Sequence, residues 1–598
     1  MIQITDKIQC CGCNACGDIC PKGSITFKMD VEGFWYPEIN KQTCINCGLC
    51  EKVCPILNNA TIREGNNLNP PTYLLQYKGI AERFNSTSGC IYPQVAKYIL
   101  EKGGYIAGHI YDKSWGVKTH ISNNLKDLEK LRNSKYCQSD AQGFYKSINN
   151  LLKEGKLVLA SGCPCQIAAL KNYLRKDFAN LITIDFTCMG IDSPLAFKKY
   201  IEYLEEIYES KVTYFKSKSK EIGWRRLTNK AIFENGRTYY GINGIDPNLI
   251  ATFMDILVRP SCFDCKFKGK QRIADISIGD FWTTGTWNNY ETLDFSIDDN
   301  SGTSYIMLNN KKAEKLFEEI KHLFKEKQID ADSVIRGNKY AIMSLPMPEF
   351  NRSLFFKCMH ENRFDKVVNE FSPKRKKTLR SYLSIIKQIA KYYNFKIVPI
   401  LRCIFFNISN KGIDSNFWEG DILMLSKKTK VFIEKGSKLV IRGKCLVQGD
   451  DSSLYIKLTQ KSELHLCNNI FRGNNINIDA RNNAKITLGN LTSIYGGVNI
   501  TSMNLISIGD FCQLSRNVLI TDNNEMVLTT DDQHGISKSI EIGTHCLFKD
   551  GTIIRKGCII GDEVITKEYS IIEGNIPSRT CLGYKISSGN NILWKNNF

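Results

Sequence analysis

Short apolar runs alternate with helical segments through the middle of the chain. Residues 157–159 and 181–184 are two such runs, and residues 166–174 between them have the spacing of a helix. Regular alternation of this kind is typical of an α/β domain. It extends from Tyr73 to about Pro348, and we divide it into an N-terminal part, 72–150, and a C-terminal part, 151–350.

A different pattern follows in residues 351–414, which we expect to form a basic helical linker. Its apolar residues fall on one stripe of a helix, and the other face carries Lys387 and Lys391. The stripe consists of Leu379, Tyr382, Leu383, Ile386, Ile389 and Tyr393. Residues 397–406 are mostly apolar but too few to span a bilayer. Two interpretations stay open: residues 373–406 lie on an anionic membrane surface, or they dock on a neighbouring domain.

From residue 415 to the end, Gly, Asn, Ile and Val recur with a period of six. Sextets open at Ile542, Ile554, Ile560, Thr566 and Ile572, and residues 508–519 show the same period. Hexapeptide repetition predicts a parallel β-helix with three short strands per coil, with one small or apolar residue of each sextet pointing inward. We therefore assign 415–598 to such a domain.

Length, cysteine content and charge limit the classes of protein to which the chain can belong. A length of 598 residues suits three or four domains. The 24 cysteines are too sparse for a disulfide scaffold, and no secretory signal opens the chain. The formal net charge is +19. Part of this charge is local, because the stretch from Ser372 to Ile413 contains ten Lys or Arg residues and no acid. No pattern of a nucleic-acid-binding module is present.

Two cysteine runs near the N-terminus carry the clearest chemistry. Both read C-x-x-C-x-x-C-x-x-x-C-P, the pattern of a bacterial two-cluster ferredoxin, in which the fourth cysteine of each run binds the other cluster. One [4Fe–4S] cluster is then expected on Cys10, Cys13, Cys16 and Cys54, and a second on Cys44, Cys47, Cys50 and Cys20. Zinc sites or disulfides are the alternatives, but the doubled, proline-terminated motif favours clusters. Residues 1–58 are assigned to this ferredoxin-type module.

Six motifs in the middle of the chain resemble the family of beta subunits of hydrogenases and dehydrogenases that use the deazaflavin coenzyme F420. They span residues 83–89, 134–139, 157–166, 185–190, 259–265 and 274–282. Together with the ferredoxin part, the resemblance covers about residues 1 to 350. It implies an iron–sulfur flavoprotein that binds FAD and passes electrons between clusters, a flavin and a second substrate.

The resemblance also implies a third [4Fe–4S] cluster. Its ligands, by motif, are Cys165, Cys188, Cys262 and Cys265. Cys163 competes with Cys165, but Cys165 directly follows the proline of the Pro-Cys-Gln motif and is preferred. A zinc site or a buried structural cysteine is the alternative.

Three loops are candidates for the flavin site. Residues 86–89 offer hydroxyl and backbone N–H groups at an expected helix start, which suits a phosphate. The candidate ligands are Ser86, Ser88, Gly89, Lys135, Gln138, Ser139 and Gly162. Cys90 departs from the family pattern, because it stands where the family has a second glycine. The sequence therefore does not decide the local backbone geometry there.

The six-residue repeats resemble hexapeptide acyltransferases with a left-handed β-helix. That resemblance implies acyl-CoA, such as acetyl-CoA, as donor and a histidine as general base. His534, in the segment 531–536, is the candidate base because an imidazole titrates near neutral pH. The segments after His545 and around Gly583 depart from the family pattern, so a β-helix used only for binding or trimerisation is the alternative.

These patterns together predict a multidomain chain: an α+β ferredoxin-like module, an α/β flavin and cluster domain, and a C-terminal left-handed parallel β-helix. The expected function is an iron–sulfur flavoprotein oxidoreductase linked to surface-polysaccharide synthesis. The alternative is an acyltransferase acting on a sugar, with an accessory redox half. Expected partners are a redox protein such as ferredoxin, a sugar substrate, a membrane surface and two further copies in a homotrimer, but no nucleic acid. The expected location is the cytoplasm, including the inner face of the membrane.

Overall fold

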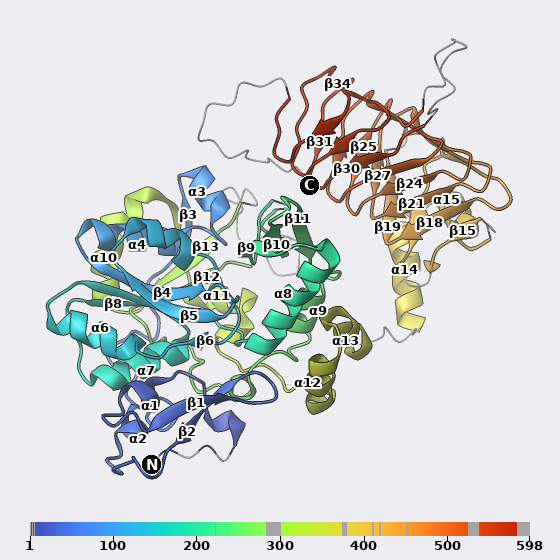
Figure 1. Cartoon of the computed structure of the whole chain (residues 1–598). Coiled ribbons are helices and arrows are strands. Elements are labelled where there is room, and N and C mark those ends of the chain that lie inside the picture. The colour runs from blue at the N-terminus through green and yellow to red at the C-terminus, as the bar shows by residue number, and fades with distance from the viewer. Residues whose placement is uncertain are drawn as a thin grey trace. The chain divides into compact units, whose positions relative to one another are not determined.

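The structure is a computed structural model that describes residues 2–582 apart from 3, 5, 222, 226, 283–300, 373–378, 410–411, 418–419, 450–451 and 524–536. The chain forms two compact units (Figure 1). Unit 1 contains Met1–Glu234 and Tyr239–Ser372, and unit 2 contains Asn235–Thr238 and Pro373–Asn590.

Unit 1 begins with the ferredoxin-type module. Its elements are α1 (Ala15–Asp18), β1 (Ile25–Met29), β2 (Trp35–Ile39) and α2 (Leu49–Val53). The strands pair antiparallel, with Ile25 opposite Ile39. Each short helix follows a residue in the left-handed region, Asn14 (φ 67°) before α1 and Gly48 (φ 72°) before α2. The two cysteine runs therefore take similar local conformations.

A nine-stranded sheet forms the centre of unit 1, in the order β14-β3-β13-β12-β8-β7-β4-β5-β6. Strands β12, β8, β7 and β4 are parallel neighbours. The strands are β3 (Thr72–Tyr77), β4 (Tyr105–Tyr111), β5 (Val117–Ser122), β6 (Ser139–Asp140), β7 (Val158–Ser161), β8 (Leu181–Phe186), β12 (Ile276–Asp280), β13 (Ser304–Leu308) and β14 (Phe324–Ile329). The predicted α/β domain is thus present.

Both faces of this sheet are covered. Leu159 packs in the core with α4 and α10, whereas its neighbours Val158 and Ala160 pack on the opposite face with α6 and α7. Strands buried on both faces carry continuous apolar runs, which explains the pattern at 157–159. The helices of unit 1 are α3 (Ile80–Asn85), α4 (Ile91–Glu101), α5 (Leu128–Leu131), α6 (Phe144–Lys153), α7 (Pro164–Leu174), α8 (Pro194–Tyr208), α9 (Pro247–Phe253), α10 (Lys311–Ile320), α11 (Ala331–Gly337), α12 (Arg352–Glu361) and α13 (Phe364–Phe371).

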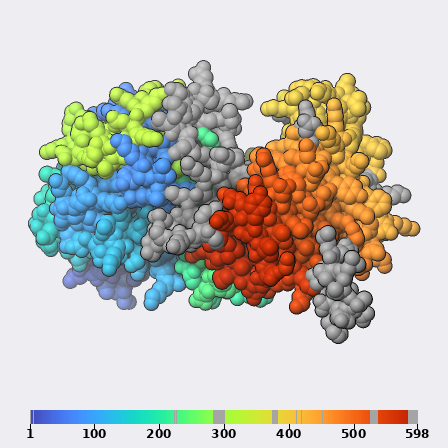
Figure 2. Space-filling model, turned by 90° about the horizontal axis from the view of Figure 1, so that it is seen from above, coloured from blue at the N-terminus to red at the C-terminus, as the bar shows by residue number. Residues whose placement is uncertain are grey.

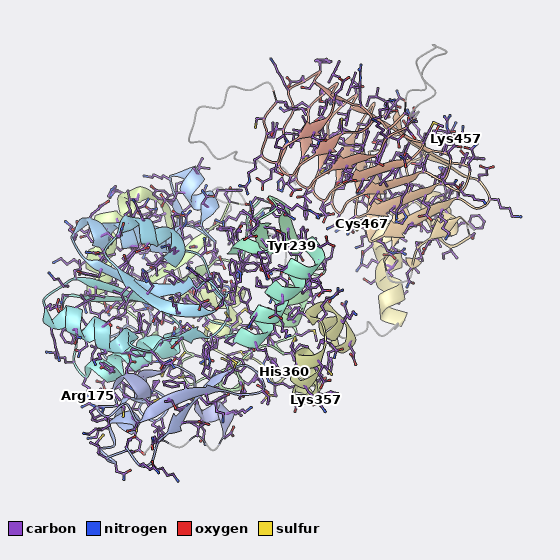
Figure 3. The ribbon with its side chains drawn as sticks, viewed as in Figure 1. Arg175, Tyr239, Lys357, His360, Lys457 and Cys467 are labelled. Atoms are coloured by element: carbon purple, nitrogen blue, oxygen red, sulfur yellow. The ribbon has the colours of Figure 1, made fainter. Side chains whose placement is uncertain are left out.

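Helices α12 and α13 belong to unit 1, although the sequence placed residue 351 at the start of the linker. Phe355 and Phe364 are buried against Tyr200 of α8, beside a three-stranded sheet of β9, β10 and β11. The strands of that sheet are β9 (Val212–Lys216), β10 (Thr228–Phe233) and β11 (Thr238–Ile242). Helix α12 also contacts the ferredoxin module, because Nε2 of His360 lies 2.8 Å from the carbonyl of Val31 (Figure 3).

Unit 2 is a parallel β-helix whose coils stack into three sheets. The first sheet contains β15 (Ile413–Asp414), β18 (Lys438–Arg442), β21 (Glu463–Cys467), β24 (Lys485–Leu488), β27 (Leu505–Ile508), β30 (Ile540–Ile542), β33 (Ile559–Ile560) and β35 (Asn575–Ile576). The second contains β16 (Ile422–Met424), β19 (Lys444–Gln448), β22 (Ile470–Arg472), β25 (Ser493–Tyr495), β28 (Gln513–Leu514) and β31 (Leu547–Phe548). The third contains β17 (Lys430–Ile433), β20 (Leu454–Leu458), β23 (Ile476–Ala480), β26 (Asn499–Ser502), β29 (Leu519–Thr521), β32 (Ile553–Ile554) and β34 (Ile571–Ile572).

The residues that recur with a period of six are the ones that point into the coil. Residues six apart, from Ile542 through Phe548, Ile554, Ile560 and Thr566 to Ile572, are all buried. Ile542 pairs with Ile560 and Ile554 with Ile572, so one turn there takes 18 residues. Earlier turns are longer: Leu464 pairs with Ile486, 22 residues on. The repeat is therefore clearest in the sequence where successive turns have the minimum length.

Candidate iron–sulfur and cofactor site

The predicted ligands of the second cluster surround one pocket. Cys20, Cys44, Cys47 and Cys50 all line it, together with Ser24 and Gly48. The backbone N–H of Ser24 donates to the sulfur of Cys20 at 3.3 Å. Burial acts to raise the pKa of Cys20, but backbone N–H groups of Ser24 and Lys22 outweigh it, so the pKa is lowered. Donors of this kind stabilise a thiolate, as cluster binding requires.

The predicted ligands of the first cluster lie on the inner side of the module. Cys16 and Cys54 pack together in one apolar cluster. The charges of Cys13, Cys10 and Cys54 all act on Cys16, although burial is the larger cause of its raised pKa. Since Cys54 belongs to the second run, the chain brings the fourth cysteine of one run to the first three of the other.

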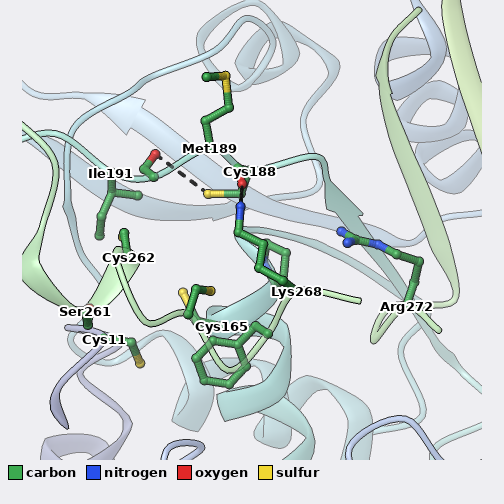
Figure 4. A pocket seen from close by; sticks show the side chains of 13 residues that line it. Cys11, Cys165, Cys188, Met189, Ile191, Ser261, Cys262, Lys268 and Arg272 are labelled. Carbon is green, nitrogen blue, oxygen red and sulfur yellow. Dashed lines mark hydrogen bonds between the residues drawn. The ribbon is translucent and has the colours of Figure 1, made fainter. Parts of the chain in front are cut away.

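The four predicted ligands of the third cluster also line one pocket in unit 1 (Figure 4). Cys165 lies in the first turn of α7, directly after β7, and Cys188 follows β8. Cys262 ends a short 3-10 helix (Pro260–Cys262), and Cys265 follows three residues later. Strands β7 and β8 are parallel neighbours, so their carboxyl ends open at the same edge of the sheet. That edge is where open α/β sheets hold ligands.

Cys163 lies beside this pocket without lining it. Its thiol is within hydrogen-bonding reach of the thiols of Cys165 and Cys188. Its backbone N–H, at the start of α7, donates to the side-chain oxygen of Gln166 at 3.0 Å. The pocket lining favours Cys165 as the ligand, as the sequence order suggested.

The thiol of Cys11 connects the ferredoxin module with the third pocket. The side chain is buried and lines that pocket. It is within hydrogen-bonding reach of Cys13, a predicted ligand of the first cluster, and of Cys165. No sequence signal marks this role, because Cys11 occupies a variable position of the motif.

Two cations complete the wall of the third pocket. Arg272 donates from Nη2 to the buried carboxylate of Asp185 at 3.1 Å. Lys268 donates to the backbone carbonyl oxygens of Cys188 and Tyr340. Positive side chains beside four thiolates offset the negative charge that a cysteine-bound cluster carries.

Four cysteines around one pocket form a donor set that a [4Fe–4S] cluster takes, and four thiolates are also a donor set for zinc.

The loop 86–89 was predicted to hold a flavin phosphate, but its polar groups form hydrogen bonds within the protein. The hydroxyl of Ser86 donates to the carbonyl of Ser88 at 2.7 Å, and the N–H of Gly89 donates to the hydroxyl of Ser304 at 2.8 Å. The ammonium of Lys220 also donates to the carbonyl of Ser88, at 2.6 Å. The helix expected at this loop starts later, at Ile91, since Ser86 instead ends α3.

Cys90 holds a conformation that glycine adopts more easily. It precedes α4 with φ 71°, in the left-handed region. This explains why the family pattern has a second glycine here. The thiol accepts a hydrogen bond from the amide of Gln94 at 3.6 Å, and the backbone therefore keeps the turn despite the substitution.

The other flavin candidates lie toward β7 and β4. Lys135 donates to carbonyls at the end of α5, including that of Arg132 at 2.8 Å, and burial lowers its pKa to about 7. Ser139 accepts from the amide of Gln166 at 2.9 Å. Gln138 instead faces the ferredoxin module and donates to the carbonyl of Gly12 at 3.1 Å. Two strands, β12 and β8, separate this region from the loop 86–89 in the sheet.

His109 is a further polar group at this edge that the sequence did not single out. It lies on β4, and a Cβ placed on Gly162 would be 3.6 Å from its Nε2. Both ring nitrogens are buried and lack a hydrogen bond of complete geometry among the described residues, although the backbone of Ser161 lies near enough to act on the pKa of the ring. Burial lowers its pKa to about 4, so the ring is neutral. Orphaned nitrogens beside a glycine mark a place where a polar group of a ligand fits.

The candidate acyltransfer base, His534, lies outside the described residues. Within the described part of the β-helix, the histidines are His465 and His545. His465 pairs with Glu463 at 2.9 Å, and His545 is buried in the wall of the coil. Neither belongs to the segment that the sequence proposed as a site.

Comparison with known proteins agrees with this geometry. The family model for the C-terminal part of coenzyme F420 hydrogenase/dehydrogenase beta subunits matches residues 155–332, and the "4Fe-4S dicluster domain" model matches residues 9–57. A coenzyme F420-dependent sulfite reductase from Methanocaldococcus jannaschii is 28% identical over 181 residues, 28% of this chain and 26% of the relative. A component of the F420H2 dehydrogenase from Methanosarcina mazei is 22% identical over 183 residues, 28% of this chain and 50% of the relative. The chain thus spans no more than half the length of these relatives.

A solved structure is also similar to part of the chain. The crystal structure of the polySia-specific acetyltransferase NeuO is 17% identical, covering 31% of this chain and 93% of that chain, at a TM-score of 0.18. The β-helix of unit 2 is established by its own strand pairing. In unit 1, both family models fall on the cysteine pockets described above. Residues 155–332 are thus similar to the C-terminal domains of coenzyme F420 hydrogenase and dehydrogenase beta subunits, and they follow a segment, residues 9–57, that matches the model of a 4Fe-4S dicluster domain.

Proposed function

We propose that the chain is an iron–sulfur flavoprotein oxidoreductase that passes electrons between three [4Fe–4S] clusters, FAD and a substrate still to be identified. The carrying observation is the pocket lined by Cys165, Cys188, Cys262 and Cys265, which borders the ferredoxin module through Cys11. Clusters bound at these sites supply one-electron transfer. The residues of the chain hold them in a fixed order, with Cys11 between the first and third sites.

Support for a flavin comes from the sheet edge next to the third site. The neutral ring of His109 and the glycine at 162 leave a polar position there, and Lys135 lies close enough to lower the pKa of that ring further. The loop 86–89 uses its polar groups for hydrogen bonds within the protein, so the flavin is proposed at the part of the edge near His109 and Lys135.

The experiment is anaerobic purification followed by iron, sulfide and flavin analysis. We expect about twelve iron atoms per chain, four for each cluster, and FAD released by denaturation. His109→Leu removes the two ring nitrogens at similar volume and is expected to lower the FAD content without changing the iron content. His360→Leu, far from this edge on α12, serves as the control. Protein with about eight iron atoms and no releasable flavin contradicts the proposal.

A second proposed activity concerns unit 2. Its turns of 18 residues suit a left-handed hexapeptide β-helix, and we propose acyl transfer from acetyl-CoA to a sugar of a surface polysaccharide, with His534 as general base. A thiol-release assay with acetyl-CoA and candidate sugars tests it. His534→Ala is expected to abolish release, whereas His465→Ala is expected to leave it unchanged. Equal rates for wild type and His534→Ala contradict this role.

A further inference from the structure

Helices α14 (Leu379–Tyr392) and α15 (Ile397–Ser409) form a pair that covers the first coil of the β-helix. Ile389 and Cys403 are fully buried against Ile422 of β16. The side-chain amide of Asn407 donates to the carbonyl of Leu423 at 3.0 Å and accepts from its N–H at 2.9 Å. Strand β16 ends its sheet, so this amide satisfies backbone groups of an edge strand. One face of the pair thus packs on the β-helix, and Figure 2 shows this part of the chain in yellow beside the orange coils.

The opposite face of α15 is a stripe of large apolar side chains open to solvent. Ile397, Leu401, Phe405 and Ile408 follow one another at helical spacing and are 72%, 60%, 71% and 50% exposed. We call these four residues the α15 stripe. Side chains of this size, contiguous on one face, are rarely left uncovered in a soluble protein and mark an interaction site.

Basic groups surround the α15 stripe. Lys391, Lys396 and Arg402 are exposed, and the segment from Ser372 to Ile413 contains ten basic residues and no acid. The guanidinium of Arg402 donates to the carbonyls of Lys427 at 3.2 Å and Thr429 at 3.1 Å, which brings a second basic loop alongside. An apolar stripe beside exposed basic side chains is complementary to an anionic lipid surface.

We propose that the α15 stripe inserts into the headgroup region of a membrane that contains anionic phospholipid and anchors the chain at that surface. None of the helices within the described residues combines the length and apolar character needed to cross a bilayer, so the helix lies in the interface plane. A second copy is a poorer occupant, because symmetric pairing of the stripe would bring like charges at Lys396 and Arg402 together. The inference is independent of the proposed redox function, since it concerns unit 2 only.

Vesicle binding of the full-length protein tests the proposal. Wild type is mixed with vesicles of phosphatidylcholine alone or of phosphatidylcholine with phosphatidylglycerol, and bound protein is measured by co-sedimentation. We expect binding about tenfold or more tighter to the anionic vesicles, weakening as salt is raised. Leu401→Ser with Phe405→Ser is expected to weaken binding by about tenfold or more. Tyr569→Ser with Ile571→Ser removes exposed side chains elsewhere in unit 2 and is expected to have no effect.

Two further measurements test the role of the basic residues and distinguish membrane binding from self-association. Lys391→Glu with Lys396→Glu keeps the α15 stripe and is expected to remove the preference for anionic vesicles. Sedimentation velocity without lipid reports self-association. Binding that is equal for wild type and the stripe variant overturns the proposal, as does failure of wild type to bind either vesicle. A dimer that the stripe variant dissociates would also overturn it, by assigning the stripe to a second copy.

Discussion

Nη1 of Arg259 lies 3.0 Å from Oε1 of Gln138, and both side chains are buried where the ferredoxin module meets the α/β domain. Arg259 also donates to the carbonyls of Cys10 at 2.8 Å and Trp35 at 3.1 Å. Gln138 donates to the carbonyl of Gly12. The pair therefore holds both the first cluster loop and the hairpin of the module, which makes the docking of the module specific.

Gly12→Ala is expected to weaken this docking. Gly12 has φ +70°, and a Cβ there would lie 2.3 Å from Nε2 of Gln138 and 2.9 Å from Cζ of Arg259. Gly103→Ala, after α4, is the matched control, since Gly103 has φ +72° but nothing within 4 Å of a Cβ. Denaturant unfolding should show a loss of about 1 kcal/mol for Gly103→Ala and about 2 kcal/mol more for Gly12→Ala. Equal losses would mean that the contact is not part of the docking.

Cys188→Ser is expected to remove the third cluster alone. One of four ligands to that cluster is lost, and the eight cysteines of the module are unchanged. Iron analysis should fall from about twelve to about eight atoms per chain. Cys358→Ser, on α12 and outside every pocket described above, should keep the full content. Full iron in Cys188→Ser would exclude that cysteine as a ligand, and Cys163→Ser against Cys165→Ser decides between those two in the same assay.

Arg272→Ala is expected to be strongly destabilising. It leaves the carboxylate of Asp185, which is completely buried, without its cation. Removing one partner of a buried pair typically costs about 3–5 kcal/mol. Arg555 pairs with Glu573 on the surface, and Arg555→Ala should cost less than about 1 kcal/mol. Chemical denaturation of the iron-loaded variants checks the difference, and similar costs would contradict the expectation.

Asp192 is expected to make stability depend on pH. Burial raises the pKa of its carboxyl to about 7 from an ordinary value of 3.8. The folded chain therefore binds this proton more tightly than the unfolded chain does. The resulting stabilisation is complete below about pH 4 and is lost as pH rises to about 7, on the order of 4 kcal/mol at most. Asp192→Asn should lack this slope when unfolding midpoints are compared between pH 5 and 8. Parallel slopes would show that another group is responsible.

Two neighbouring isoleucines on β33 test the inside of the β-helix. Ile560 is buried and Ile559 is 53% exposed. Ile560→Ala should destabilise unit 2 by about 2–4 kcal/mol because it leaves a cavity, whereas Ile559→Ala should cost less than about 1 kcal/mol. Thermal unfolding measured by circular dichroism compares them. A larger loss for Ile559→Ala than for Ile560→Ala would contradict the prediction that Ile560 points into the coil.

Much of the fold could be predicted because local patterns repeat. The apolar run around Leu159 indicated a buried strand, and the sextets from Ile542 to Ile572 indicated the last turns of the β-helix. The domain was also assigned correctly from residue 415, but the individual coils before residue 508 were not delimited, since turns of unequal length, such as that from Leu464 to Ile486, break the period. Helix α12 was assigned to a linker because its burial depends on α8, which is distant in sequence.

The candidate site was predicted only as far as its residues stand in motifs. The cysteines of the third pocket were named because they stand in motifs that resemble those of the beta-subunit family. Cys11, His109 and Lys220 gained their roles from contacts between segments far apart in the chain, and no local spacing marks such contacts. Arg259 lies inside one of the motifs. Its contact with the ferredoxin module is shared with Gln138, which is more than a hundred residues away in the sequence.

The docking of the module has a consequence for how the protein meets other molecules. Asp18 of the module accepts hydrogen bonds from the N–H groups of Gly143 and Tyr145 at the start of α6, so it is held on that side as well as at Arg259. A domain that is held by contacts on two sides does not move as a mobile carrier between an electron donor and an electron acceptor. Cys47 and Ile45 are exposed on the second ligand loop, so we expect an external redox protein to approach the module there.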